Sequence, residues 1–227
     1  MNANPAFQIA VWLVPLIIAI VFHEVAHGLV ARRLGDPTAE QAGRLTFNPL
    51  KHIDPFGTVI LPLLLAISHA PVFGWAKPVP VAYGNLKHPR RDMVLVALAG
   101  PGMNLLLALV GAIILAATLS FSANAQSLGA TLIAANALNF ILINIFLGVF
   151  NLIPVPPFDG GHVVEGLLPP PLAQGFRQIG RFSLLVFVVL LLVLPAISPK
   201  LNVVGRVVSP LVDHIATGLL GLFGIHL

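Results

Sequence analysis

The sequence predicts an all-α polytopic membrane protein with about four transmembrane helices, a short re-entrant or β segment and a C-terminal amphipathic helix. Apolar residues make up 57% of the 227 residues and charged residues only 9%, whereas a soluble domain carries roughly 25% charged residues. With 12 basic and 8 acidic side chains, the chain cannot cover the surface of a soluble fold of this length. The composition also excludes a disordered chain and a collagen-like fibre.

Four apolar runs are long enough to cross a bilayer core of about 30 Å. They cover residues 7–31, 93–119, 131–153 and 179–197. No Lys or Arg precedes the first run, and this run is too long for the apolar part of a signal peptide, so we expect it to stay in the protein. The apolar run 56–67 is shorter and contains Pro62, so we expect it to dip into the membrane and return.

Three weaker patterns complete the predicted architecture. The segments GRLTF (43–47) and KPVPVAY (77–83) are the plausible sheet edges, although the prolines block pairing on one side. The last 27 residues have an apolar stripe with helical spacing, which favours a helix lying at the membrane interface. The stripe consists of Val204, Val207, Val208, Leu211, Val212, Ile215, Leu219 and Leu222.

The basic residues indicate topology. The 12 basic residues exceed the 8 acidic residues, which gives a net charge of +4. Because the basic residues are few and scattered, we expect no nucleic-acid partner. If residues 56–67 do not cross the membrane, ten of the twelve basic residues lie on one side and only Lys200 and Arg206 on the other. Because basic residues gather on the cytoplasmic side, the N-terminus is predicted to lie outside. We expect a multi-pass protein of the plasma membrane.

The motif HEVAH, residues 23–27, is the strongest sign of chemistry. His23 and His27 lie one helical turn apart on one face, so both rings can reach one metal ion. Glu24 is placed to take a proton from water at that ion. A chance HExxH on a surface helix is the alternative. It is weak here, because ionisable groups inside a lipid-spanning helix are costly unless they are paired or bind a metal.

A hydrolytic zinc site needs three protein ligands and one open position. The chain contains no cysteine, so the third ligand must be a carboxylate or another histidine. Asp159 is the best candidate, because it follows a predicted span and precedes two glycines that permit close backbone approach. Glu165 is possible. A turn-forming role is the alternative for Asp159.

These motifs together resemble the site-2 protease family of intramembrane zinc metalloproteases, in a short form without a PDZ-like or CBS-like module. The resemblance extends from residue 11 to about residue 168. It is carried by HEVAH with Gly28, GRLTFNPLKHIDPFG (43–57), GWAKPVPV (74–81), AGPGMN (99–104) and NLIPVPPFDGGH (151–162).

The resemblance implies that His23, His27 and Asp159 hold one Zn²⁺ per chain. It implies that Glu24 activates water and that Asn151 positions substrate or stabilises the oxyanion. Asn104 either has a role in the site or is a small polar residue in helix packing, and His162 orients the DGG turn. The five remaining histidines are interpreted as loop or interface residues: His52, His69, His88, His214 and His226.

The implied activity is zinc-dependent endopeptidase cleavage of transmembrane segments of membrane-protein substrates. Residues 1–227 would form one domain, with a core at 7–168 and C-terminal helices at 172–227. Since His23 lies roughly 24 Å along its span, the active site is expected near the cytoplasmic face. Two alternatives remain. A zinc or proton-coupled transporter would need polar residues along a through path, and a non-catalytic relative would bind membrane segments without cutting them.

Overall fold

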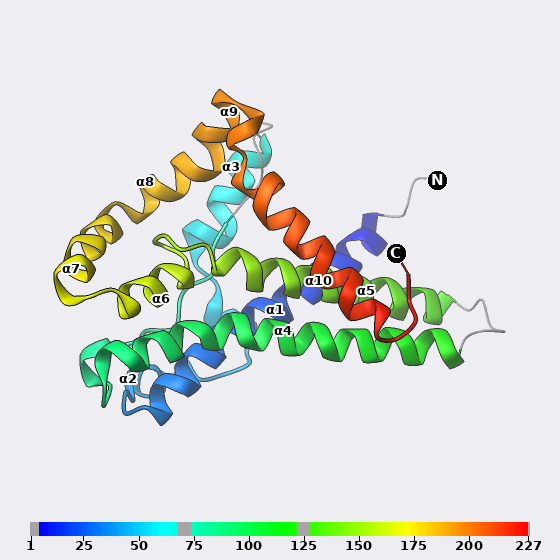
Figure 1. The fold of residues 1–227 in the computed structure, drawn as a ribbon. Coiled ribbons are helices and arrows are strands. Elements are labelled where there is room, and N and C mark those ends of the chain that lie inside the picture. The colour runs from blue at the N-terminus through cyan, green and yellow to red at the C-terminus, as the bar shows by residue number, and fades with distance from the viewer. Residues whose placement is uncertain (1–4, 68–73, 122–127, 227) are drawn as a thin grey trace.

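Three long helices form the centre of the molecule (Figure 1). The computed structural model describes residues 5–67, 74–121 and 128–226. Helix α1 covers Pro5–Arg33, α4 covers Pro89–Phe121 and α5 covers Leu128–Asn151. Each helix has contacts with the other two, so the three long helices pack as a bundle.

The connection between α1 and α4 consists of short helical pieces and extended chain. These pieces are α2 (Thr38–Gln41), a 3₁₀ turn at Pro49–His52, a π turn at Pro55–Ile60, α3 (Leu61–Ile67) and a 3₁₀ turn at Tyr83–Asn85. Residues 74–82, here called the cavity loop, form neither a helix nor a strand. No strand occurs among the described residues, so the predicted β segment is not confirmed.

The chain after α5 turns away from the bundle and then returns to it (Figure 1). Helix α6 covers Asp159–Leu167, α7 covers Pro170–Ile179, α8 covers Ser183–Val188 and α9 covers Leu194–Ile197. A 3₁₀ turn at Gly180–Phe182 precedes α8, and a π turn at Val189–Val193 joins it to α9. A second π turn, Val204–Val208, leads into α10, which covers Ser209–Gly221.

Among the residues that the structure describes, four helical stretches are long and apolar enough to cross a membrane: Val11–Arg33, Pro89–Phe121, Gly129–Asn151 and Pro170–Ile197. The prediction of about four transmembrane helices is therefore confirmed by length and composition. In the most apolar window of the fourth stretch, no residue is buried inside the protein. Such an exposed apolar surface is favourable in contact with lipid and unfavourable in contact with water.

The main core lies between α4, α5 and α10. Ala108 and Ala112 of α4 pack with Ile141 and Ile145 of α5, and the small α4 residues let the two helices approach closely. The C-terminal segment adds residues spaced four apart: Val208 at the end of the second π turn, and Val212, Ala216 and Leu220 of α10.

The predicted C-terminal amphipathic helix is confirmed, but its buried face is rotated. Val208 and Val212 are buried as the stripe requires, whereas Leu211 is 46% exposed and Leu222 is 80% exposed. The reason is that α10 packs against α5, so the surface of α5 selects which residues of α10 are covered. Periodicity alone could not show this partner.

Candidate metal centre

Two histidines and one aspartate converge at the start of α6. The Nε2 atoms of His23 and His27 lie 3.0 Å apart on adjacent turns of α1. Asp159 Oδ2 lies 3.2 Å from His23 Nε2 and 3.3 Å from His27 Nε2. The three potential ligand atoms all lie within 4.8 Å of one another. The structure therefore brings together the three residues that were predicted to bind a metal.

The other nitrogen of each ring is already engaged. His23 Nδ1 lies 2.6 Å from Asn104 Oδ1, and His27 Nδ1 lies 2.7 Å from the carbonyl oxygen of Val96. Carbonyl oxygens only accept hydrogen bonds, so both Nδ1 atoms must donate. In the neutral rings both Nε2 atoms then carry lone pairs, and these face a carboxylate oxygen. Three acceptors that face one point without a proton between them form a cation site.

The aspartate has the charge that a metal ligand needs. Asp159 Oδ2 is buried and has no hydrogen-bond donor. A carboxyl group is ionised at neutral pH, and the ionised form is the one that binds a divalent cation.

Glycines allow the surrounding helices to approach the ligands. A Cβ atom on Gly100 of α4 would lie 2.4 Å from His27 Nε2 and 2.5 Å from His23 Cε1. A Cβ atom on Gly160 would lie 2.3 Å from the carbonyl oxygen of Leu152. Since real Cβ atoms do not approach so closely, both positions require glycine. The DGG sequence thus lets α6 fold back tightly against the end of α5.

A cavity of about 690 Å³ lies beside the three ligands. Glu24 and Asn151 line it together with His23, His27 and Asp159. Glu24 Oε2 accepts a hydrogen bond of 2.8 Å from the backbone N–H of Val79 in the cavity loop. Asn151 donates to the carbonyl oxygen of Leu147 at 3.0 Å. All five predicted site residues are therefore neighbours of one cavity.

Comparisons with known proteins agree with this geometry. A profile described as peptidase family M50 matches residues 11–137 and 119–194. The chain belongs to peptidase family M50. This is the site-2 protease family, so the resemblance recognised from the motifs is confirmed. As a member of family M50, the chain is a metallopeptidase and a multi-pass membrane protein.

Three similar relatives come from distant organisms. YwhC of Bacillus subtilis is 39% identical over 178 residues, which is 78% of each chain. Rip2 of Mycolicibacterium smegmatis is 33% identical over 86% of this chain and 68% of its own length. MJ0611 of Methanocaldococcus jannaschii is 33% identical over 71% and 74%. All three carry names that assign them provisionally to the zinc metalloproteases. No solved structure matches the chain.

Two residues weighed in the sequence lie outside this M50 ligand group. Glu165 pairs with Arg177, whose Nε lies 2.7 Å from Glu165 Oε1. His162 lines the cavity, and its ring packs on Tyr83 with centroids 5.3 Å apart. Burial and the negative charges of Asp159 and Glu165 raise the pKa of Tyr83 to about 12. Tyr83 is therefore a neutral phenol in the cavity wall.

Four further residues near the M50 site were given no individual role from the sequence. The carbonyl group of Val96 contacts His27, and Gly100 lies against both histidines. Asn144 contacts Asn104, which is the partner of His23. Asp36 is fully buried, and its Oδ2 accepts a hydrogen bond of 2.7 Å from the backbone N–H of Ala82, which fastens the cavity loop. The signal for Asn144 was present, since an amide inside an apolar span needs a partner.

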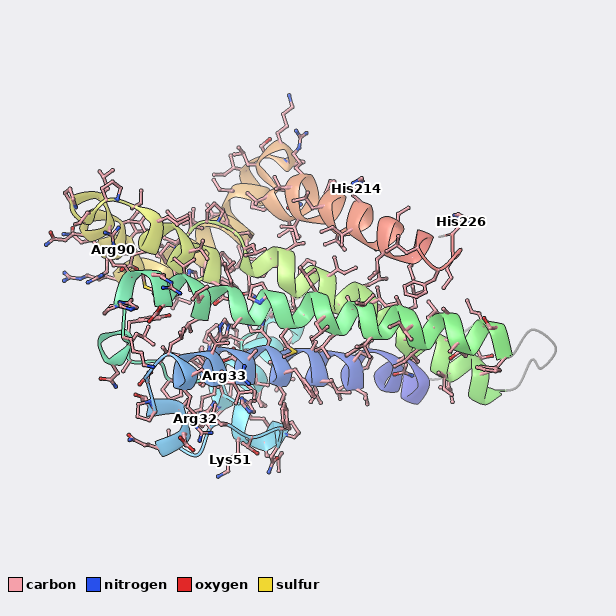
Figure 2. All side chains as sticks on the ribbon, turned by 60° about the horizontal axis from the view of Figure 1, so that its bottom comes forward. Arg32, Arg33, Lys51, Arg90, His214 and His226 are labelled. Carbon is pink, nitrogen blue, oxygen red and sulfur yellow. The ribbon has the colours of Figure 1, made fainter. Side chains whose placement is uncertain are left out.

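Basic residues cluster at the end of the bundle where α1 finishes and α4 begins. Figure 2 shows Arg32, Arg33 and Arg90 at this end, together with Lys51 of the connecting segment. His214 and His226 lie elsewhere, along and after α10. The metal-ligand group is nearer to the basic end of α1, because His23 and His27 lie in its C-terminal half.

Proposed function

We propose that this chain is a zinc-dependent endopeptidase that cuts transmembrane segments of other membrane proteins. One observation carries the proposal. The Nε2 atoms of His23 and His27 and the Oδ2 atom of Asp159 lie 3.0–3.3 Å from one another and face one point. A glutamate lies beside them, and all four residues line one cavity.

The proposed cofactor is one Zn²⁺ per chain, held by His23, His27 and Asp159. Two imidazoles and one carboxylate are a ligand set of catalytic zinc, which keeps a fourth position open. The names of the relatives support the same metal. When bound, zinc supplies the Lewis acidity that activates water and polarises the scissile carbonyl group.

The catalytic roles follow from the positions of the side chains. Glu24 takes the proton from the attacking water and passes it to the leaving amine nitrogen. The hydrogen bond from Val79 orients its carboxylate. Asn151 lines the same cavity and uses one amide N–H within its own helix. Its other amide N–H is the proposed donor to the scissile carbonyl oxygen.

The substrate is proposed to bind in an extended form along the cavity loop. A helix hides its carbonyl groups in backbone hydrogen bonds, so the segment to be cut must unwind locally. Trp75 and Lys77 donate their backbone N–H groups to Gly57 and His52. In an extended chain the intervening residue, Ala76, directs its backbone groups to the opposite side. Ala76 lines the cavity and is the proposed pairing point for the substrate backbone.

We also propose that residues 1–227 act as one protease domain in the plasma membrane, with the active site toward the cytoplasm. The packing of α10 against α5 supports a domain that includes the C-terminal helices. The basic residues at one end of the bundle support the orientation. The presence of Glu24 beside the ligands supports an active enzyme over a relative that only binds membrane segments.

The test is a cleavage assay with purified full-length protein in liposomes. The wild-type chain is expected to contain zinc and to cut synthetic transmembrane peptides. Glu24→Gln keeps the shape of the side chain and removes its basicity, so we expect zinc to remain and turnover to fall at least 100-fold, roughly the contribution of a general base.

Glu40→Gln is the matched control. Glu40 is an exposed residue that pairs with Arg32, so this variant should cut like the wild type. Retained turnover in Glu24→Gln would show that another group is the base. Absence of both zinc and cleavage in the wild-type protein would overturn the proposed function.

A further inference from the structure

Two asparagines lie completely buried between the long apolar helices. Asn104 of α4 and Asn144 of α5 are both 0% exposed. A buried amide that lacks partners is strongly unfavourable, and this cost is greater still in a membrane-spanning segment, where water cannot replace the partners. Their hydrogen bonds therefore constrain how both side chains are oriented.

The hydrogen bonds of the two asparagines run in one direction. Asn144 Nδ2 donates to the backbone carbonyl oxygen of Phe140 at 2.8 Å, which leaves its Oδ1 to accept. Asn104 Nδ2 donates to that Oδ1 at 2.8 Å and to the carbonyl oxygen of Ala19 at 3.3 Å. Asn104 Oδ1 then accepts from His23 Nδ1 at 2.6 Å. Because a backbone carbonyl oxygen cannot donate, this order cannot be reversed.

The direction of these hydrogen bonds determines the tautomer of His23. Its Nδ1 must carry the proton, so the lone pair of its Nε2 points toward Asp159. His27 reaches the same state without a side-chain partner, because its Nδ1 donates to the backbone carbonyl oxygen of Val96. Only one of the two histidines therefore depends on side chains that a substitution can remove.

We propose that Asn104 is a positioning residue, oriented by Asn144, that holds His23 in the tautomer and ring orientation required for metal binding. The series of hydrogen bonds runs from α5 through α4 to α1. Metal affinity is therefore expected to depend also on how α5 packs on α4. This inference rests on the zinc site proposed above. It gives Asn104 a role distinct from helix packing, the other role that its place in an apolar span allowed.

Asn139 is a matched control for helix packing. It lies on the same helix as Asn144, and its Nδ2 donates to the carbonyl oxygen of Val11 on α1 at 2.8 Å. It therefore joins two helices as Asn104 does, but it does not touch either histidine. Replacing it removes an interhelical hydrogen bond and leaves the ligand group unchanged.

The experiment compares Asn104→Leu, Asn144→Leu and Asn139→Leu in the purified full-length protein. Zinc affinity is measured by competition with a chelator, and the ligand field is measured by the visible spectrum after Co²⁺ replaces zinc. We expect Asn104→Leu to lower zinc affinity about 10–100-fold, as the loss of a ligand's hydrogen-bond partner does, and to alter the Co²⁺ spectrum. Asn144→Leu should cause a smaller loss, and Asn139→Leu should lower only the melting temperature.

Wild-type zinc affinity in Asn104→Leu would overturn the proposal, and so would an equal loss of affinity in Asn139→Leu. If Asn104→Leu does not fold, the tautomer of His23 is measured in the wild-type protein by ¹⁵N spectra of labelled histidine, assigned with His23→Gln. We expect a protonated Nδ1 both with and without zinc, and a protonated Nε2 in the zinc-free protein would overturn the proposal. If the wild-type protein binds no zinc, the proposed function fails, but the tautomer in that protein still decides the role of Asn104.

Discussion

At the scale of single residues, the metal centre is defined by which atoms can donate a proton. Asp159 Oδ2 has no donor, and both histidine Nδ1 atoms are engaged by carbonyl oxygens. We therefore expect a substitution to change metal affinity if it alters one of these atoms. How far the substituted residue lies from HEVAH in the sequence should not matter.

Replacing Asp159 tests its role as the third ligand. Asp159→Asn keeps the size of the side chain but removes the charge that offsets the metal, so we expect the purified protein to lose nearly all of its zinc. Glu165→Gln is the control, because Glu165 pairs with Arg177 and should leave the zinc content unchanged. Measuring the zinc content of both variants shows which of the two carboxylates binds the metal. Loss of zinc only in Glu165→Gln would assign the third ligand to Glu165.

Two glycines of α4 provide a matched pair of substitutions. A Cβ atom on Gly100 would lie 2.4 Å from His27 Nε2, whereas a Cβ atom on Gly102 would have no atom within 4 Å. We expect Gly100→Ala to lower zinc affinity at least tenfold, because the ligands must move. Gly102→Ala should bind zinc normally and gain up to about 1 kcal/mol of stability, since alanine favours a helix. Chelator competition and thermal unfolding measure both effects, and equal zinc affinities would contradict the geometry.

At the scale of the elements, the cavity loop depends on a carboxylate that does not belong to the active site. Asp36 accepts from the backbone N–H of Ala82 at 2.7 Å and from the side chain of Asn85 at 3.0 Å. Burial alone would raise the pKa of Asp36, but hydrogen bonds from Thr38, Asn85 and Ala82 lower it. Because the backbone N–H of Val79 in the same loop donates to Glu24, a shift of the loop would also move the carboxylate of the proposed base.

Asp36→Ala tests this coupling. We expect zinc to stay bound, turnover to fall and the melting temperature to drop, because the buried N–H of Ala82 loses its partner at a cost of about 1–3 kcal/mol. Since the pKa of Asp36 is lower in the folded state, its contribution is full at neutral pH and is lost as the pH falls below about 4. Thermal unfolding between neutral and acidic pH should therefore show a smaller stability difference between variant and wild type in acid. Asp213→Asn, on an exposed residue of α10, is the control and should behave like the wild type.

The elements also show what the sequence could predict. Length and hydropathy were sufficient for α1, α4 and α5, and HEVAH with the DGG turn was sufficient for the ligand group. The face of α10 was only partly predictable, because α5 selects it. The strand proposed at 77–83 is not confirmed, and Pro78 and Pro80 lack the N–H groups that a ladder needs. The roles of Asn144 and Asp36 depend on contacts between residues 40 or more positions apart, which local patterns cannot reveal.

At the scale of the whole molecule, one ligand group fixes the relative directions of the spans. His23 lies in the C-terminal half of α1, and Asp159 follows the end of α5. Because both reach the same point, α1 and α5 must enter the membrane from the same side. The chain between them must therefore cross once more, and α4 is the candidate span in that interval.

This argument predicts the sides on which three positions lie. Cysteines at Leu50 and Gly84 should both be labelled from the cytoplasm, and a cysteine at Phe121 should be labelled from the opposite side. The chain has no native cysteine, so each label is unique. Leu50 is 72% exposed and Phe121 is 91% exposed, and a side chain at Gly84 would meet no atom within 4 Å. Labelling of positions 50 and 84 from opposite sides would mean that residues 55–67 cross the membrane. In that case α1 and α5 could not place His23 and Asp159 at one depth, and the proposed zinc site would be excluded along with the topology.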